Sequence, residues 1–419
     1  MGVVVARWPV VKTEPVTPEL VGLDEIRAAR ERLRGVAVQT PLDRSRALSA
    51  ICGSEVFVKC ENLQRTGSFK IRGAYNRIVQ LDEHERAAGV VAASAGNHAQ
   101  GVALAASLAG IEATVFMPAG ASLPKAEATK RYGARVVLGG HDFGAAFKAA
   151  EEHAATTGSV FVHPFDHPHV IAGQGTIGCE ISEQLGDVGT VVVPVGGGGL
   201  IAGIAAAIKE LHPSASILGV QAAGAASFPR SLAHGAPVAL ESMSTIADGI
   251  AANRPGDLTF AHVREQVDDV VCVGEDAIAE ALVTTAERMK LVLEPAGAAG
   301  VAAVMQRLGE LRPPVVVVLS GGNVDPLLLL RVMRHGLSAS GRYLAFRTRI
   351  PDKPGELYRL LGLVAEMEAN IVGVEHHREG VAVHLDEVEM TLQIETKGPT
   401  HIQQVTGRLA SAGYSIERL

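Results

Sequence analysis

The sequence predicts an α/β fold with parallel sheets, followed by a small α+β unit at the C-terminus. Between residues 55 and 325, short β-branched runs alternate with stretches of helical period, which is typical of strands joined by crossover helices. The 46 glycines and the aromatic content of 4% favour tight turns and close helix packing over a sandwich with an aromatic core. After residue 341 the order of elements changes, which indicates a separate unit.

The predicted strands of the first part are short apolar runs: Val56–Lys59, Val90–Ala93, Ala113–Met117, Arg135–Leu138, Thr190–Val195, Ile217–Val220 and Val315–Leu319. The predicted helices are mostly alanine-rich: Ile71–Leu81, Gly101–Ala109, Leu200–Leu211, Asp276–Lys290 and Ala296–Leu308. Ligands of open parallel sheets bind outside the carboxyl ends of the strands. We therefore expect the chemistry in the loops that directly follow the strands.

The C-terminal unit is predicted to have β-α-β-β-α-β order, which is the order of a ferredoxin-like sandwich. Its predicted elements are a strand over Leu344–Ile350, a helix from Glu356 to Met367, strands near Ile371–Val374 and Val388–Ile394, a helix over Ile402–Ala412 and a last strand over Tyr414–Ile416. The first helix follows the turn Asp352–Glu356, which contains a proline and a glycine.

The charges and cysteines exclude several classes of partner. Lys and Arg number 38 against 45 Asp and Glu, which gives a net charge of −7 without a long run of either sign. We therefore expect neither nucleic acid nor an acidic membrane as a partner. The four cysteines are too few and too scattered for a disulfide framework, and no C-x-x-C pair suggests zinc, so we expect a cytoplasmic protein.

Two segments need separate interpretation because they resemble targeting or membrane signals. Residues 1–22 are predicted to be a loose N-terminal arm, because charges and prolines interrupt any leader-like apolar stretch. The uncharged segment between Asp187 and Lys209 has the length of a membrane span, but Pro194 and four glycines interrupt it. We interpret this segment as a buried strand, a turn and a helix.

The loop Glu61–Ala74 contains Lys70 after a Thr-Gly-Ser turn, at the start of a predicted helix. A lysine at this position faces the positive end of the helix dipole, which favours a neutral amine able to form a Schiff base. Phe69 beside it would help to exclude water. From this segment alone, an ordinary solvated lysine is the alternative interpretation.

The run Gly196–Gly199 lies between an apolar strand and a predicted helix. Successive backbone N–H groups at a helix N-terminus predict a phosphate cradle, with a flexible turn as the alternative. The pattern Gly197-x-Gly199-x-x-Ala202 also fits the degenerate dinucleotide fingerprint, which keeps a nicotinamide enzyme open. The next strand ends at Gln221 without an acidic residue for a ribose hydroxyl, so a lone phosphate suits the site better.

Two more loops directly follow strands. Ser94-Ala-Gly-Asn-His98 combines small residues with the side-chain amide of Asn97, and its backbone donors suit a carboxylate. Ser320-Gly-Gly-Asn323 presents a neutral hydroxyl where a cofactor ring could rest. Taken singly, either loop could be an ordinary turn.

In this order, the four segments resemble those of pyridoxal-phosphate enzymes of the tryptophan-synthase-β type, and within them the threonine/serine ammonia-lyases, over most of residues 25 to 330. The resemblance implies a catalytic domain over residues 23–335 made of two open-sheet α/β lobes. The smaller lobe, about residues 63–155, would be inserted in the larger one. Lys70 would hold the cofactor, pyridoxal 5'-phosphate, as a Schiff base.

The same resemblance implies the remaining contacts. The cofactor contacts would be Phe69, Asn97 at the phenolic oxygen, Gly196, Gly197, Gly198, Gly199 and Leu200 at the phosphate, and Ser320 at the pyridine nitrogen. The substrate contacts would be Ser94, Ala95, Gly96, Asn97 and His98.

The implied activity is the β-elimination and deamination of L-threonine to 2-oxobutanoate and ammonia, with L-serine open as a second substrate. A hydroxyl partner leaves the pyridine nitrogen largely unprotonated, which favours elimination over long-lived carbanions. We expect the freed amine of Lys70 to remove the α proton while the β-hydroxyl leaves as water. The alternatives are a serine-preferring dehydratase or racemase, a nicotinamide-dependent dehydrogenase and a non-catalytic amino-acid sensor.

Departures from the related serine racemases refine this expectation. Ala95 stands where those enzymes have a serine that acts as the acid on the opposite face, so racemisation should be minor. Their metal-holding carboxylates align with Gln221 and, less surely, Ser227, which are poor ligands for a hard cation, so we expect no metal there. The histidine-rich segment His163–His169 is a further metal candidate, with an ordinary loop as the favoured interpretation.

Residues 336–341 are predicted to be a linker of small residues, and residues 342–419 resemble an ACT domain, an amino-acid-binding module often fused to threonine dehydratases. The resemblance implies a branched-chain amino-acid effector, isoleucine or valine, at Pro354 and Gly355. It also implies a homodimer or homotetramer. A passive dimerisation module is the alternative.

Overall fold

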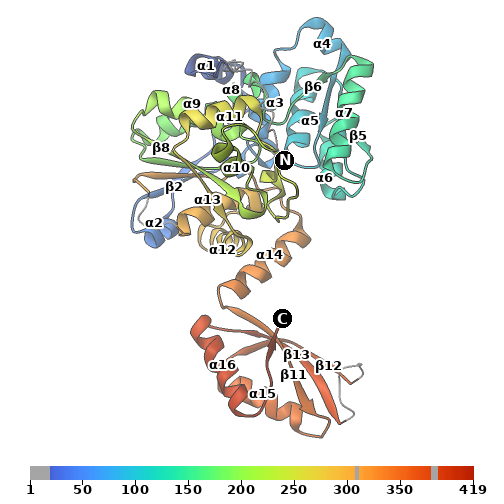
Figure 1. The fold of residues 1–419 in the computed structure, drawn as a ribbon, viewed down its shortest axis with the longest axis vertical. Helices are drawn as coiled ribbons and strands as arrows, with labels where there is room; N and C mark the ends of the chain where they lie inside the picture. Colours follow the sequence, from blue (N-terminus) through green and yellow to red (C-terminus); the bar gives the residue numbers. More distant parts are fainter. Residues whose placement is uncertain (1–18, 307–310, 379–385) are drawn as a thin grey trace, which may run out of the picture.

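The computed structural model describes residues 19–306, 311–378 and 386–419. Within these ranges the strands form a six-stranded sheet and two four-stranded sheets. Figure 1 shows the C-terminal sheet set apart from the other two, with helix α14 (Pro326–Ala339) leading to it. The predicted α/β fold class with a C-terminal α+β unit is confirmed, whereas most of the predicted N-terminal arm lies outside the described residues.

The larger sheet has the strand order β1-β2-β10-β7-β8-β9, and every neighbouring pair is parallel except β1 with β2 at the edge. Its central strands are buried throughout, because helices cover both faces of a parallel sheet. The strands are β1 (Leu42–Arg44), β2 (Val56–Lys59), β7 (Thr190–Pro194), β8 (Ser216–Ala222), β9 (Asp269–Val273) and β10 (Val315–Val318). The accompanying helices are α1 (Leu23–Arg32), α2 (Arg46–Cys52), α8 (Pro168–Leu185), α9 (Gly199–Leu211), α10 (Ser227–His234), α11 (Asp257–Gln266), α12 (Glu275–Thr284) and α13 (Pro295–Gln306).

The smaller sheet has the order β5-β4-β3-β6 and is parallel throughout. Its strands fall between β2 and β7 in the chain: β3 (Val90–Ala93), β4 (Ala113–Met117), β5 (Arg135–Leu138) and β6 (Val160–Phe161). The helices of this part are α3 (Lys70–Ile78), α4 (Glu83–Ala88), α5 (Asn97–Ala109), α6 (Leu123–Arg131) and α7 (Phe143–Thr157). The bounds of β3, β4 and β5 are those predicted, and β6 was not predicted because its two residues are too short for a pattern.

Several predicted helix ends differ from the observed ones. Helix α5 begins at Asn97 rather than Gly101, so the polar residues of the loop form its first turn. The predicted helix Asp276–Lys290 is observed as helix α12, which ends at Thr284, followed by a π-helical turn over Thr285–Met289. The end of the predicted helix Ala296–Leu308 lies outside the described residues.

The C-terminal sheet is antiparallel with the order β12-β13-β11-β14, as in a ferredoxin-like sandwich. Its elements are β11 (Tyr343–Pro351), α15 (Glu356–Glu366), β12 (Asn370–His377), β13 (Glu387–Glu395), α16 (Pro399–Ser411) and β14 (Glu417–Arg418).

The predicted strand Tyr414–Ile416 is wrong, because this segment follows the end of helix α16 at Ser411 and the strand lies at Glu417–Arg418. Gly413 has a φ of 93°, and the N–H of Tyr414 donates to the carbonyl of Leu409 at 3.1 Å. The buried Tyr414 therefore packs as a helix-end contact rather than as part of a ladder.

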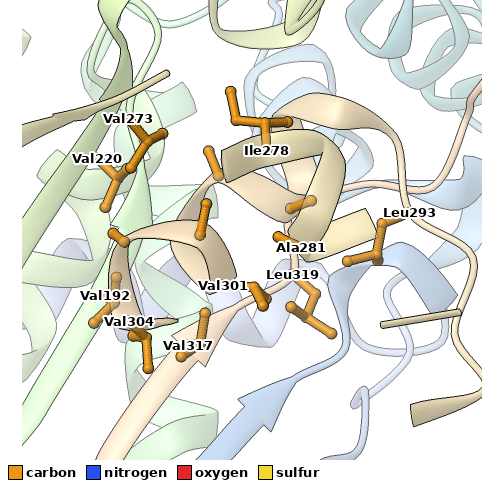
Figure 2. Close-up of a cluster of buried hydrophobic side chains, with 14 of the residues drawn as sticks. Val192, Val220, Val273, Ile278, Ala281, Leu293, Val301, Val304, Val317 and Leu319 are labelled. Atoms are coloured by element: carbon orange, nitrogen blue, oxygen red, sulfur yellow. The ribbon is translucent and has the colours of Figure 1, made fainter. Parts of the chain in front are cut away.

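The core of the larger half surrounds helix α13 (Figure 2). Val192, Val220 and Val317 of the central strands face this helix, which contributes Val301 and Val304. All five side chains are buried, so α13 is held rigidly against the sheet. Glu294 directly precedes α13, so its backbone is held in place as well.

Among the described residues, no helix combines the length and apolar character needed to cross a membrane.

Candidate active site

Lys70 begins helix α3 and is brought to Ser320 by contacts between two loops. The N–H of Phe69 donates to the carbonyl of Ser320 at 3.2 Å, and the N–H of Gly322 donates to the carbonyl of Gly67 at 2.9 Å. Thr66, before this turn, has a φ of 64°, which is strained for a β-branched residue. The first and fourth predicted loops therefore form one continuous surface at the carboxyl ends of β2 and β10.

The side chain of Lys70 is partly buried among its neighbours. Its Nζ donates to the carbonyl of Pro164 at 2.9 Å and lies 5.2 Å from the centroid of the Phe69 ring. Desolvation by burial lowers the pKa of Lys70 to about 8, and the charge of Glu294 opposes this shift. The direction is the one expected for a nucleophilic amine, and its main cause is burial.

Asn97 lies beside Lys70 because helices α3 and α5 approach closely at Gly101. A Cβ at Gly101 would lie 3.1 Å from the backbone carbon of Lys70, so only glycine fits without a shift. The side-chain Nδ2 of Asn97 donates to Glu294 Oε1 at 2.6 Å, and its Oδ1 accepts from Asn323 Nδ2 at 2.8 Å.

The rest of the Ser94–His98 loop divides into a surface part and an interior part. Ser94 Oγ accepts from the N–H of Gly96 at 3.1 Å, and Ala95 and Gly96 are partly exposed. His98 is buried, with Nε2 2.8 Å from the carbonyl oxygen of Val162. Burial is the main reason why the pKa of His98 falls to about 3, so this imidazole is neutral.

The glycine loop follows β7 and opens α9, with Gly198 in the left-handed region at a φ of 102°. The ring of Phe165 lies directly against it, because a Cβ at Gly197 would be 2.3 Å from the ring. In the described part of the chain, the N–H groups of Gly197, Gly198 and Gly199 donate to no protein acceptor. These three donors at a helix N-terminus are available to an anion.

The sequence analysis did not identify two residues, Thr259 and Gln221, as supports of the glycine loop. Thr259 Oγ1 donates to the carbonyl of Gly197 at 2.6 Å. Gln221, considered above only as a poor metal ligand, is fully buried and donates from Nε2 to the carbonyl of Val195 at 3.3 Å, while its Oε1 accepts from the N–H of Phe228 at 2.8 Å. The amide of Gln221 therefore joins the start of the glycine loop to helix α10.

The segment His163–Asp166 is part of the site rather than an outlying loop. Pro164 contacts Lys70 and Phe165 contacts the glycine loop, while His163 Nδ1 accepts from the N–H of Asp166 at 2.8 Å. Among the described residues, no group of three potential ligands is arranged to hold a metal. The segment His163–Asp166 follows β6, whose two residues leave no pattern in the sequence, so no sequence signal placed this segment at the site.

Helix α3 is fixed by a buried ionic cluster of Lys59, Glu61, Arg72 and Glu180. Arg72 donates to Glu61 at 2.8 Å and to Glu180 at 2.6 Å, and Lys59 donates to Glu180 at 2.6 Å. All four side chains are buried. Since Arg72 is only two residues after Lys70, this cluster sets the position of the first turn of the helix.

The residues present fit a phosphorylated cofactor. The hydroxyl oxygens Thr66 Oγ1 and Ser68 Oγ are buried without a hydrogen-bond partner, although they flank the turn that carries Lys70. Buried polar groups normally find a partner, so these two indicate that a polar group belongs beside them. The glycine N–H groups supply the matching place for an anionic phosphate.

The predicted effector residues lie in the C-terminal unit. Gly355 is the N-terminal cap of α15 with a φ of 95°, and nothing lies within 4 Å of the position of a Cβ there. Pro354 precedes it and is exposed. A hollow of about 520 Å³ lies at the opposite end of α15, where Met367, Pro399 and His401 line it.

Comparison with known proteins agrees with this geometry. A family model described as pyridoxal-phosphate dependent enzyme matches residues 33–321. An L-threonine ammonia-lyase of Thermotoga maritima is 48% identical over 397 residues, which are 95% of this chain and 99% of that protein. The processed form of threonine deaminase isoform 2 from Solanum lycopersicum has a TM-score of 0.71 at 38% identity and covers 76% of this chain and 96% of its own. Maize serine racemase has a TM-score of 0.72 at 38% identity and covers 76% of this chain and 99% of its own.

Proposed function

Because this chain belongs to the family of pyridoxal-phosphate-dependent enzymes, and because a relative of matching length is an L-threonine ammonia-lyase, we infer that it deaminates L-threonine with bound pyridoxal phosphate. The observation that carries this conclusion is the 48% identity over 95% of this chain and 99% of the relative. A match of this extent includes both the candidate active site and the C-terminal unit. The enzyme is therefore a lyase.

We propose that Lys70 Nζ holds the cofactor and then carries the α proton of the substrate. Bound pyridoxal phosphate supplies an electron sink for the bond that breaks at the α-carbon. The lowered pKa of Lys70, about 8, supports this role, because part of the amine is neutral near physiological pH. The free N–H groups of Gly197 to Gly199 support a phosphate site, and the contact of Ser320 with Phe69 supports a place for Ser320 beside the ring.

The first turn of α5 is proposed to bind the substrate carboxylate through the backbone donors of Ser94–His98. The β-hydroxyl of threonine then leaves as water, and the enamine that remains hydrolyses to 2-oxobutanoate and ammonia. L-serine would give pyruvate by the same steps. Racemisation should be minor, because Ala95 offers no acid on the opposite face.

The test compares Lys70→Ala with Lys130→Ala, because the side chain of Lys130 is half exposed and pairs with Glu127. We expect Lys70→Ala to lose at least roughly a thousandfold in 2-oxobutanoate formation from L-threonine, since it removes both the anchor and the base. Borohydride treatment should fix the cofactor on the peptide containing Lys70 in the wild type and in Lys130→Ala. A Lys70→Ala protein that keeps both turnover and covalent cofactor would contradict the assignment.

We further propose a cytoplasmic homodimer or homotetramer whose C-terminal unit binds a branched-chain amino acid near Pro354 and Gly355. All four cysteines are free, which supports a reducing compartment. Strand β12 lies at an edge of its sheet and exposes Ile371, Val372 and Val374, which supports contact with a second copy. Deletion of residues 342–419 should abolish the kinetic response to isoleucine and valine. A truncated enzyme that responds like the full chain would exclude this sensor.

A further inference from the structure

Glu294 is a buried carboxyl group that no step above uses. It directly precedes α13, is only 4% exposed, and its N–H donates to the carbonyl of Gly321 at 3.1 Å. A Cβ at Gly321 would lie 2.4 Å from Glu294 Oε1, and one at Gly249 would lie 3.3 Å from it. The carboxyl group is therefore enclosed between two glycines and held by the rigid start of α13.

The hydrogen bonds of Glu294 continue into a chain of two amides with defined directions. At one end, the carbonyl of Thr66 can only accept, and Asn323 Nδ2 donates to it at 2.6 Å. The same Nδ2 donates its second hydrogen to Asn97 Oδ1 at 2.8 Å. Asn97 must then turn its NH₂ group away from Asn323, and one N–H donates to Glu294 Oε1 at 2.6 Å.

In the described network, these hydrogen bonds leave one N–H donor of Asn97 unused. An amide nitrogen carries two hydrogens, and in the described hydrogen-bond network the second N–H of Asn97 has no protein acceptor. An ionised carboxylate cannot donate, so it accepts the Asn97 N–H and prevents the amide from flipping. The orientation of the free N–H is thus set from both ends, by an acceptor-only carbonyl and an acceptor-only carboxylate.

We propose that Glu294, with Asn323, is a positioning residue that fixes the amide of Asn97 so that its one free N–H is offered to the phenolic oxygen of the cofactor. This proposal rests on the proposed function, because it assumes that the cofactor occupies the space beside Lys70 and Asn97.

The charges around Glu294 allow this device to respond to pH. The groups that face it are Lys70 on α3, Asn97 on α5, Lys125 on α6 and Asp248 in the turn Asp248–Ile250. Burial is the main cause that raises the pKa of Glu294 to about 7; Asp248 adds to the rise, and Lys125, Asn97 and Lys70 oppose it. Below that pH the protonated carboxyl could also donate, and the constraint on the amide would relax.

The test follows the visible absorption band of the bound cofactor in the full-length enzyme as a function of pH. The variants are Glu294→Gln, Asn97→Ala and the double variant that combines these two changes. Glu294→Gln keeps the shape of the side chain but replaces an acceptor-only carboxylate by an amide that also donates. Glu275→Gln is the matched control, because Glu275 accepts two bonds, from Thr245 Oγ1 and the N–H of Ile246, away from this chain of amides. Asn323→Ala releases the amide from the other end and serves if Glu294→Gln does not fold.

We expect Glu294→Gln, Asn323→Ala and Asn97→Ala to shift the midpoint of the pH titration of this band in the same direction, by about one pH unit. The double variant should shift no further than Asn97→Ala, and Glu275→Gln should not shift. Additive shifts in the double variant, or an unshifted Glu294→Gln, would overturn the positioning role alone. A wild-type enzyme without a visible band or borohydride-fixed Lys70 would instead overturn the proposed function, and this proposal with it.

Discussion

Replacing Gly197 by alanine tests whether the glycine loop and the Lys70 side chain are coupled through Phe165. The new Cβ would lie 2.3 Å from two carbons of the Phe165 ring, whereas ordinary contact begins at 3.4 Å. The ring must therefore move by about 1 Å. The ring is not free to move, because the residues on both sides of Phe165 are held. The carbonyl of Pro164 accepts from Lys70 Nζ, and the carboxylate of Asp166 accepts from the N–H groups of Asp257 and Thr259, both at 3.0 Å.

The size of the effect follows from the cost of overpacking, about 1 to 3 kcal/mol for an added methyl in a close-packed site. If the cost falls on the cofactor-bound form, the dissociation constant of pyridoxal phosphate should rise between about 5-fold and 150-fold, since 1.4 kcal/mol corresponds to tenfold. Without a phosphate bound to its N–H groups, the glycine loop itself can move away from the Phe165 ring, so the thermal stability of the cofactor-free protein should change less.

The assay is an absorbance titration of cofactor-free protein with pyridoxal phosphate, paired with thermal unfolding of both forms. Gly274→Ala is the control, because Gly274 has a φ of −82° and nothing lies within 4 Å of its added Cβ. The coupling through Phe165 is refuted if Gly197→Ala binds the cofactor as tightly as the wild type, or if Gly274→Ala weakens binding equally.

Two further predictions concern stability. Arg72→Met removes the cation that pairs with the buried carboxylate of Glu61 and one of the two that pair with Glu180, so the free energy of unfolding in denaturant should fall by about 3 to 5 kcal/mol. Arg27→Met, at an exposed pair, should change the free energy of unfolding by no more than about 0.5 kcal/mol, and equal losses in the two variants would contradict the argument. The folded pKa of His98, about 3, lies below its ordinary value of 6.5, so its contribution to stability is complete above pH 6.5 and is lost as the pH falls toward 3. His98→Asn should remove about 1.4 kcal/mol per pH unit from the acid-side slope of unfolding free energy, and an unchanged slope would show that His98 is not neutral in the fold.

The alternation of apolar runs was enough to predict most of the first two sheets, because buried parallel strands leave a strong signal. Strands β3, β4 and β5 begin and end where the sequence indicates. The pattern gave a wrong strand at Tyr414. This residue is buried just after the end of α16, where its N–H donates to the carbonyl of Leu409. Strand identity there is decided by the left-handed Gly413 and by tertiary contacts, which no local pattern contains.

From the residues alone, the candidate site was predicted as separate loops, and only the family resemblance joined them into one cofactor site. Sequence reasoning selected Lys70, Asn97, the glycine loop and Ser320, because each directly follows a strand or opens a helix. It could not find Glu294, since an isolated glutamate before an alanine-rich helix looks like a solvated helix start. Its contact with Asn97 joins residues far apart in the chain, and only the folded sheets bring them within 2.6 Å.

The pairing of Ser68 with Gly321 also bears on how the protein is made. A nascent chain that has emerged from the ribosome only as far as β8 contains Lys70 and the glycine loop but lacks the segment that holds the Lys70 turn in place. Capture of vitamin B6 in its final geometry must therefore wait until the Ser320 loop is synthesised. Contacts between such distant segments form slowly, so the active site is completed only after nearly all of the catalytic part of the chain has been made.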